Sequence, residues 1–142
     1  SSSGGTQAGM ALGARLTGYK GKILGISIED KAADLQSKVV DLANQMAKRL
    51  MVNEVFSSEN ILVNDDYLGA GYGKFSELEK NAIKFFAQKA ALFLDPVYTG
   101  RAAGALMDLI NKKFLKRGET VLFWHTGGLP AIFAESYQPE LM

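Results

Sequence analysis

The first nine residues, SSSGGTQAG, combine small hydroxyl side chains with glycine in a loop of the kind that binds phosphate. Glycine lets backbone N–H groups turn towards an anion without interference from a Cβ atom. Apolar residues follow at Met10, Leu12 and Leu16 and predict a helix, whose N-terminus attracts negative charge. We therefore predict a phosphate site whose members are Ser3, Gly4, Gly5 and Thr6. Such loops normally follow a parallel strand, so the chain is expected to begin inside a domain.

Three later loops place tyrosine, threonine or histidine beside glycine. They are Gly71-Tyr72-Gly73, Asp95-Pro96-Val97-Tyr98-Thr99-Gly100 and His125-Thr126-Gly127-Gly128. Each lies between an extended segment and a helix, and such loops meet at one edge of a parallel sheet, where α/β proteins bind ligands. We predict that Tyr72, Tyr98, Thr99 and Thr126 converge with the phosphate loop on one pocket. Because the chain has no cysteine and one histidine, His125, no metal site is expected.

The elements that must position these loops follow from hydrophobic periodicity. Apolar residues recur at spacings of three and four over residues 31–51 and predict an amphipathic helix, with Asp30 capping its first turn. The members of its apolar stripe are Leu35, Val39, Leu42, Met46 and Leu50. Ser76 and Glu79 form a capping box for a helix over residues 77–92. The remaining predicted elements are strands at 22–28, 60–64 and 120–124, a helix over about 100–115, and a last helix with Pro130 in its first turn. Strands that alternate with helices predict an α/β fold, a parallel sheet with helices on both faces.

The composition excludes several classes of protein. The chain has 142 residues, of which 47% are hydrophobic, enough for one ordinary core. A net charge of +1 gives no electrostatic basis for binding nucleic acid or an anionic membrane. No apolar run reaches the ~18 residues that a membrane span requires. We therefore expect no nucleic-acid partner and no membrane association.

The four loops, in this order, resemble the C-terminal half of the D-cysteine desulfhydrase / 1-aminocyclopropane-1-carboxylate deaminase family. The matching segments are Ser3–Gly9, Gly71–Gly73, Leu94–Gly100 and His125–Pro130. The resemblance covers the chain from end to end. It implies the tryptophan-synthase-β-like fold (fold type II) and the cofactor pyridoxal 5′-phosphate. Residues 1–142 are then expected to form a single partial domain, the C-terminal, cofactor-binding part of the large domain.

The resemblance also implies roles for individual residues. The loop Ser3–Thr6 would hold the cofactor phosphate, and Tyr98 would pack on the face of the pyridine ring. The residues around the pyridine nitrogen would be Thr99, Thr126 and Gly127. Tyr72 would face the substrate, which makes Tyr72 and Tyr98 the expected catalytic residues. His125 and Asp95 are expected to be structural, the first hydrogen-bonded at a strand end and the second capping the turn into Tyr98.

One position indicates the subtype. Family deaminases that open a cyclopropane ring typically have glutamate after the ring-stacking tyrosine, where a carboxylate keeps the pyridine nitrogen protonated. This chain has Thr99 there, and a neutral hydroxyl holds that proton far less well. The resemblance therefore favours a lyase that eliminates sulfide from D-cysteine to give pyruvate, ammonia and hydrogen sulfide. One alternative is the deaminase, which is a hydrolase. The other is a phosphate-binding α/β fragment without activity.

Members of this family are much longer than this chain. The missing part would contain the lysine that forms the Schiff base, the Ser-Asn pair that holds the substrate carboxylate, and most of the small domain. We expect the chain to be inactive alone. Its expected partners are the complementary N-terminal part of the same protein, a second copy in a homodimer, and a small amino-acid substrate. The expected location is the cytoplasm, with an organelle also open.

Overall fold

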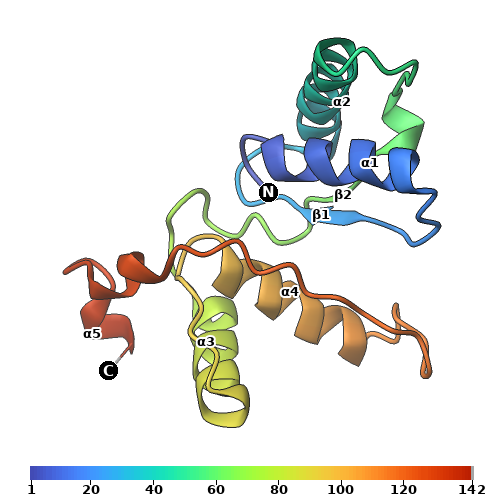
Figure 1. The fold of residues 1–142 in the computed structure, drawn as a ribbon. Helices are drawn as coiled ribbons and strands as arrows, with labels where there is room; N and C mark the ends of the chain where they lie inside the picture. Colours follow the sequence, from blue (N-terminus) through green and yellow to red (C-terminus); the bar gives the residue numbers. More distant parts are fainter. Residues whose placement is uncertain (142) are drawn as a thin grey trace. The chain divides into compact units, whose positions relative to one another are not determined.

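The computed structural model describes residues 1–141 and divides the chain into two compact units, Ser1–Leu68 and a second unit that begins at Gly69 (Figure 1). The elements of the first unit are α1 (Gly5–Thr17), β1 (Leu24–Ile26), α2 (Ala32–Arg49), the 3₁₀ helix η1 (Ser58–Asn60) and β2 (Leu62–Asn64). Those of the second unit are α3 (Glu77–Ala90), α4 (Thr99–Asn111), the 3₁₀ helix η2 (Leu129–Phe133) and α5 (Gln138–Leu141). Within residues 1–141, no helix is both long enough and apolar enough to cross a membrane.

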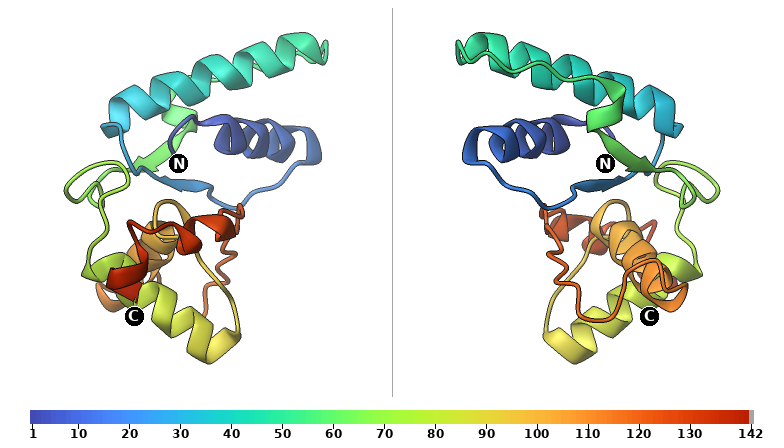
Figure 2. Two further views of the ribbon diagram at one scale, coloured as in Figure 1. Left: turned by 90° about the vertical axis from the view of Figure 1, so that its left-hand side faces the viewer. Right: turned by 90° about the vertical axis from the view of Figure 1, so that its right-hand side faces the viewer.

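The first unit is a parallel α/β arrangement, as predicted. β1 and β2 pair in parallel with Gly25 opposite Val63. α1 and α2 pack against each other and lie on the same side of this sheet (Figure 2). β2 is shorter than the predicted strand at 60–64 because Asn60 belongs to a capped 3₁₀ turn, in which its side chain accepts a hydrogen bond from Ser57 N (2.9 Å).

The apolar stripe of α2 forms most of the core of this unit. The buried residues of the helix are Leu35, Val39, Ala43 and Ala47, which pack with Ala8, Ala11 and Leu12 of α1. Leu42 and Met46 lie at the margin of this core, partly buried. The inclusion of Leu50 in the stripe is wrong: Leu50 follows the last helical residue and is 59% exposed.

Asp65, not Asp30, caps the first turn of α2. Asp65 Oδ2 accepts a hydrogen bond from Ala32 N at 3.0 Å, across 33 positions of sequence. The Asp30 carboxylate instead accepts from Lys38 Nζ at 2.7 Å and raises the pKa of that lysine. The predicted cap at Asp30 is therefore wrong, because the backbone residue at the helix boundary is Lys31 and a carboxylate from the end of β2 reaches the first turn.

We predict that Asp65→Ala lowers the free energy of unfolding of the chain by about 1 kcal/mol, the usual cost of a lost helix cap. Asp30→Ala is the matched control, since it removes an exposed ion pair with Lys38, and such pairs contribute little to stability. Urea unfolding followed by circular dichroism measures both. A larger loss for Asp30→Ala than for Asp65→Ala would contradict the assignment.

In the second unit, α3 and α4 pack closely against each other. The capping box at the start of α3 is confirmed: Glu79 Oε2 accepts from Ser76 N at 2.8 Å, and Ser76 Oγ accepts from Leu78 N. A Cβ atom added at Gly104 of α4 would lie 2.9 Å from the Leu78 carbonyl oxygen, so glycine is what permits the close contact. The buried core between these helices consists of Ala82, Ile83, Leu94 and Ala103.

The predicted strand at residues 120–124 is wrong. This segment is irregular, and Leu122 and Trp124 are 74% and 56% exposed. A strand requires a neighbouring strand for its hydrogen bonds, and within residues 1–141 the sheet contains β1 and β2 only. Phe123 anchors the segment by stacking on Phe86, with ring centroids 6.1 Å apart. The last predicted helix is a short 3₁₀ helix, η2, with Pro130 in its first turn as expected.

Candidate cofactor site and active site

The phosphate loop lies at the start of α1 and leaves the first turn of that helix open. Gly4 is the N-cap residue and adopts a left-handed conformation (φ +80°), and it provides no side-chain cap. The first N–H groups of a helix have no partner within the helix, and this first turn contains no acidic residue. Gly5, Thr6 and Gln7 therefore present N–H donors and the positive end of the helix dipole to an anion.

Gly4 is also held in place by packing. It is buried, and a Cβ atom added to it would lie 2.8 Å from Val39 Cγ2 of α2. Ser3 and Thr6 remain exposed on either side, so their hydroxyls are accessible from solvent. The result is a cradle of backbone donors flanked by two hydroxyl side chains, which fits a phosphate group.

The cradle follows a stretch of backbone that runs beside β1. The Ser1 amino group donates to Ile26 O, and Ile28 N donates to Ser1 O at 3.1 Å. This pair of bonds is the pattern of two parallel strands. It lies on the opposite edge of β1 from β2, because Ser27 N donates to Asn64 O. The loop thus occupies the carboxyl end of a strand position, where phosphate loops of α/β proteins are found.

In the second unit, Asp95 organises the turn that leads into α4. Its buried carboxylate accepts hydrogen bonds from the backbone N–H groups of Val97 (2.8 Å), Tyr98 (2.6 Å) and Thr99 (2.8 Å). The N–H groups of Val97 and Tyr98 belong to the turn before α4, and that of Thr99 is the first of the helix, so Asp95 caps the turn into α4. This confirms the structural role expected for it.

Thr99 is turned towards the same carboxylate. Its hydroxyl donates to Asp95 Oδ2 and accepts from Asp95 N, both at 2.8 Å, and the residue is 2% exposed. The sequence does not indicate this pair of hydrogen bonds between Thr99 and Asp95. Thr99 therefore supports the turn from inside, and both of the hydroxyl's roles are satisfied there.

The two tyrosines expected to be catalytic contact each other. Their hydroxyl oxygens are 2.5 Å apart, and the rings meet edge to face with centroids separated by 6.0 Å. Tyr72 and Tyr98 are 49% and 39% exposed. One phenol donates to the other, and the accepting phenol keeps its own proton for a further partner.

The loop that contains His125 packs against the Asp95 turn. A Cβ atom at Gly128 would lie 2.6 Å from Asp95 Oδ2, so this position (φ +90°) has room for glycine alone. His125 Nδ1 accepts from Gly127 N and its Nε2 faces Phe93 O, each at 3.1 Å. Both ring nitrogens are used, which confirms the structural role expected for His125. Thr126 is exposed.

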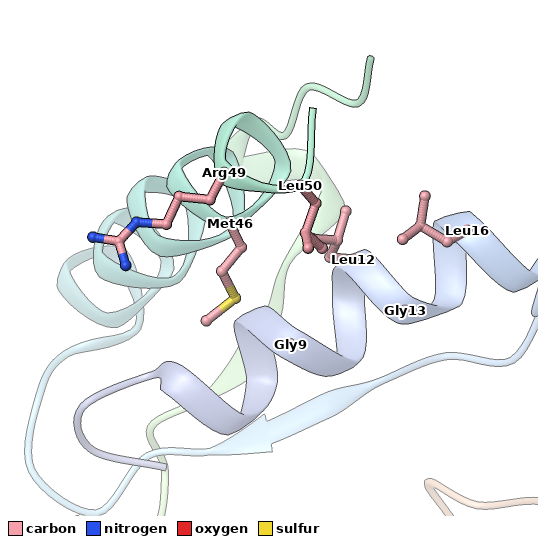
Figure 3. A pocket seen from close by; sticks show the side chains of 7 residues that line it. All are labelled: Gly9, Leu12, Gly13, Leu16, Met46, Arg49 and Leu50. Carbon is pink, nitrogen blue, oxygen red and sulfur yellow. The ribbon is translucent and has the colours of Figure 1, made fainter. Parts of the chain in front are cut away.

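The structure thus brings together three of the four predicted loops, those that contain Tyr72, Tyr98 and Thr126. The fourth, Ser3–Thr6, belongs to the first unit, and its convergence with the others stays a prediction. A separate apolar groove lies between α1 and α2, lined in part by Leu12, Leu16 and Met46 (Figure 3). No predicted site residue lines this groove, so it is not part of the candidate site.

Sequence reasoning missed a buried ion pair beneath the tyrosine loop. Arg101 is 1% exposed, and its Nε donates to Glu79 Oε1 at 2.5 Å. The capping box gives Glu79 an evident role, and no local spacing links it to an arginine 22 positions away.

Comparison with known proteins gives the family. Residues 1–127 match the sequence pattern of the PALP family, described as pyridoxal-phosphate dependent enzymes. The chain belongs to the pyridoxal-phosphate-dependent enzyme family. It is also similar to a solved structure described as "Crystal Structure Analysis of the ACC deaminase homologue", with 33% sequence identity and a TM-score of 0.82. The match covers 98% of this chain and 40% of that one. The family resemblance, the fold class and the cofactor are thereby confirmed.

The residues present fit the cofactor. The cradle at Ser3–Thr6 offers backbone N–H donors at an uncapped helix N-terminus without an acidic residue, which suits an anion. Family membership therefore assigns pyridoxal 5′-phosphate as the cofactor. The individual contacts assigned from sequence to Tyr98, Thr126 and Gly127 stay predictions.

Proposed function

We propose that this chain is the cofactor-binding part of a D-cysteine desulfhydrase-like lyase. The net reaction converts D-cysteine and water into pyruvate, ammonia and hydrogen sulfide. The observation that carries the proposal is the environment of the residue after Tyr98. Thr99 is uncharged, and the neighbouring Asp95 carboxylate accepts from three backbone N–H groups and one hydroxyl.

A pyridine nitrogen at this site would therefore meet a neutral hydroxyl and no free carboxylate. Because the Thr99 hydroxyl is used within the turn, Thr126 is the hydroxyl that we assign to the nitrogen, with Gly127 beside it. A neutral partner leaves the nitrogen less protonated and makes the ring a weaker electron sink. Elimination of sulfide tolerates a weaker electron sink, because the leaving thiolate takes up the electrons. Opening a cyclopropane ring offers no such leaving group and therefore depends more on a strong electron sink.

The remaining residues have distinct tasks in this proposal. Pyridoxal 5′-phosphate, when bound, supplies an electron sink for the carbanion formed at the substrate Cα. Ser3–Thr6 bind its phosphate and Tyr98 supports its ring. Tyr72 and Tyr98 hold a proton at their paired hydroxyl oxygens, from which the accepting phenol can donate to the departing sulfur.

The lysines support the view that a further segment completes the enzyme. All of them are exposed except Lys80, which is half-buried and lies 3.8 Å from Glu77. A lysine that attacks a carbonyl needs a desolvated or electropositive pocket, and these positions offer none. We propose that the catalytic lysine lies in an N-terminal part of the same protein, and that the whole enzyme is a homodimer.

Product analysis of the enzyme completed with that N-terminal part tests the function. We expect pyruvate and sulfide in equal amounts from D-cysteine, and no product from this chain alone. A four-carbon 2-oxo acid from 1-aminocyclopropane-1-carboxylate, without sulfide from D-cysteine, would contradict the lyase and support the deaminase. Phosphate binding without any product would support the inactive fragment instead.

A further inference from the structure

A buried guanidinium holds the loop that contains Tyr72. Arg101 lies in the first turn of α4, and its guanidinium donates hydrogen bonds in different directions. Its Nε binds Glu79 Oε1 of α3 at 2.5 Å, its Nη1 binds Gly71 O at 3.1 Å, and its Nη2 binds Lys74 O at 2.6 Å. The carbonyls of Gly71 and Lys74 lie on either side of Tyr72 in the sequence, so the guanidinium binds the loop before and after that residue.

The loop depends on such external contacts. Gly69, Gly71 and Gly73 all have positive φ angles (57°, 114° and 67°), a conformation that costs glycine little but fixes nothing by itself. Besides Arg101, Tyr137 donates from its hydroxyl to Gly73 O at 2.9 Å. Side chains of the second unit therefore hold the loop at three carbonyl groups, those of Gly71, Gly73 and Lys74.

Arg101 is in turn oriented by the Glu79 carboxylate, which is itself buried and hydrogen-bonded. Glu79 is fully buried, and its second oxygen, Oε2, accepts from both the backbone N and the hydroxyl of Ser76 at the cap of α3. The same carboxylate thus caps the start of α3 and orients the guanidinium. Arg101 lies three residues after Tyr98, so one end of α4 carries both the tyrosine and the arginine that positions its partner.

We propose that the Glu79–Arg101 pair is a positioning device that sets the Tyr72 hydroxyl against the Tyr98 hydroxyl. The claim that this tyrosine pair serves catalysis rests on the proposed function, whereas the positioning itself does not. Arg101 acts through the loop backbone and is not a catalytic residue. Lysine cannot replace it, because a single ammonium group cannot reproduce the fork that binds Glu79 and two carbonyls.

The test compares Arg101→Lys with the natural chain. The chain is labelled with ¹³C at tyrosine Cζ, and the Cζ signals of Tyr72 and Tyr98 are assigned by NMR from Tyr72→Phe and Tyr98→Phe. In the natural background we expect Tyr98→Phe to shift the Tyr72 signal, because the two hydroxyls share a hydrogen bond. In the Arg101→Lys background we expect Tyr98→Phe to leave the Tyr72 signal in place, because the hydroxyls are no longer held together. Arg15→Lys, a change at an arginine of the first unit, is the matched control and should leave both signals unchanged.

Activity of the completed enzyme provides the second measurement. Arg101→Lys is expected to lower kcat by about 10²-fold, the cost of a misplacement of roughly 1 Å, with little change in KM. If that variant loses its helical circular dichroism, Glu79→Gln, which keeps an oxygen for Arg101 Nε, replaces it in the same comparison. If Tyr98→Phe shifts the Tyr72 signal equally in the folded Arg101→Lys variant and in the natural background, the inference is overturned. Loss of that shift with unchanged kcat would support the inference and contradict the catalytic role of the tyrosines.

Discussion

Replacing Tyr72 by phenylalanine is expected to lower the turnover of the completed enzyme by about 10²–10⁴-fold, the usual effect of losing a general acid–base group. The substitution removes one hydroxyl from a pair of oxygens 2.5 Å apart and leaves the ring in its edge-to-face contact with Tyr98. Affinity for pyridoxal 5′-phosphate should change little, because Tyr72 is assigned no contact with the cofactor. Steady-state rates with D-cysteine and a cofactor titration measure the two quantities.

Tyr19→Phe is the matched control for this experiment. Tyr19 is an exposed tyrosine of the first unit, and it belongs to none of the predicted site loops. We expect the control to retain its turnover. Full activity in Tyr72→Phe would mean that Tyr72 only shapes its loop, and that the proton transfers are made by the lysine that we place in the N-terminal part.

Replacing Gly4 by alanine is expected to destabilise the chain by about 2–4 kcal/mol. One part of this cost is the left-handed conformation, and the other is the collision of the new Cβ with Val39, 2.8 Å away. The first turn of α1 must shift to relieve the contact, and its N–H donors move with it. We therefore expect the affinity for inorganic phosphate and for pyridoxal 5′-phosphate to fall by about tenfold or more, the loss of one charge-assisted hydrogen bond.

Gly9→Ala is the control, because it changes a glycine of the same helix where an added Cβ meets no atom within 4 Å. This variant should bind phosphate normally and gain up to about 1 kcal/mol of stability from better helix propensity. Urea unfolding and phosphorus NMR measure the two effects. Equal phosphate affinity in Gly4→Ala and Gly9→Ala would contradict the assignment of the loop.

Features fixed by neighbours in sequence could be predicted without a structure. The capping box of Ser76 and Glu79 and the cap formed by Asp95 each involve residues at most four positions apart, and both are confirmed. The glycine-rich loop at the start of α1 likewise follows from local residue types. The order of four such loops was enough for the family, which the comparisons then established.

Features that depend on distant segments could not be read in the same way. Asp65 caps α2 from 33 positions away, and nothing local distinguishes it from Asp30. The apolar segment 120–124 has the composition of a strand, but pairing requires a neighbour that periodicity does not reveal. The resemblance places Thr99, Thr126 and Gly127 around the pyridine nitrogen, and spacing alone does not indicate that the Thr99 hydroxyl bonds to Asp95.

The central claim is that the first turn of α1 binds the cofactor phosphate, and amide NMR of the ¹⁵N-labelled chain tests it most directly. Pyridoxal 5′-phosphate and inorganic phosphate should both shift the amide signals of Gly5, Thr6 and Gln7 more than any others of α1. Pyridoxal, which lacks the phosphate, should leave them in place. Equal shifts with pyridoxal, or shifts confined to the apolar groove between α1 and α2, would contradict the account.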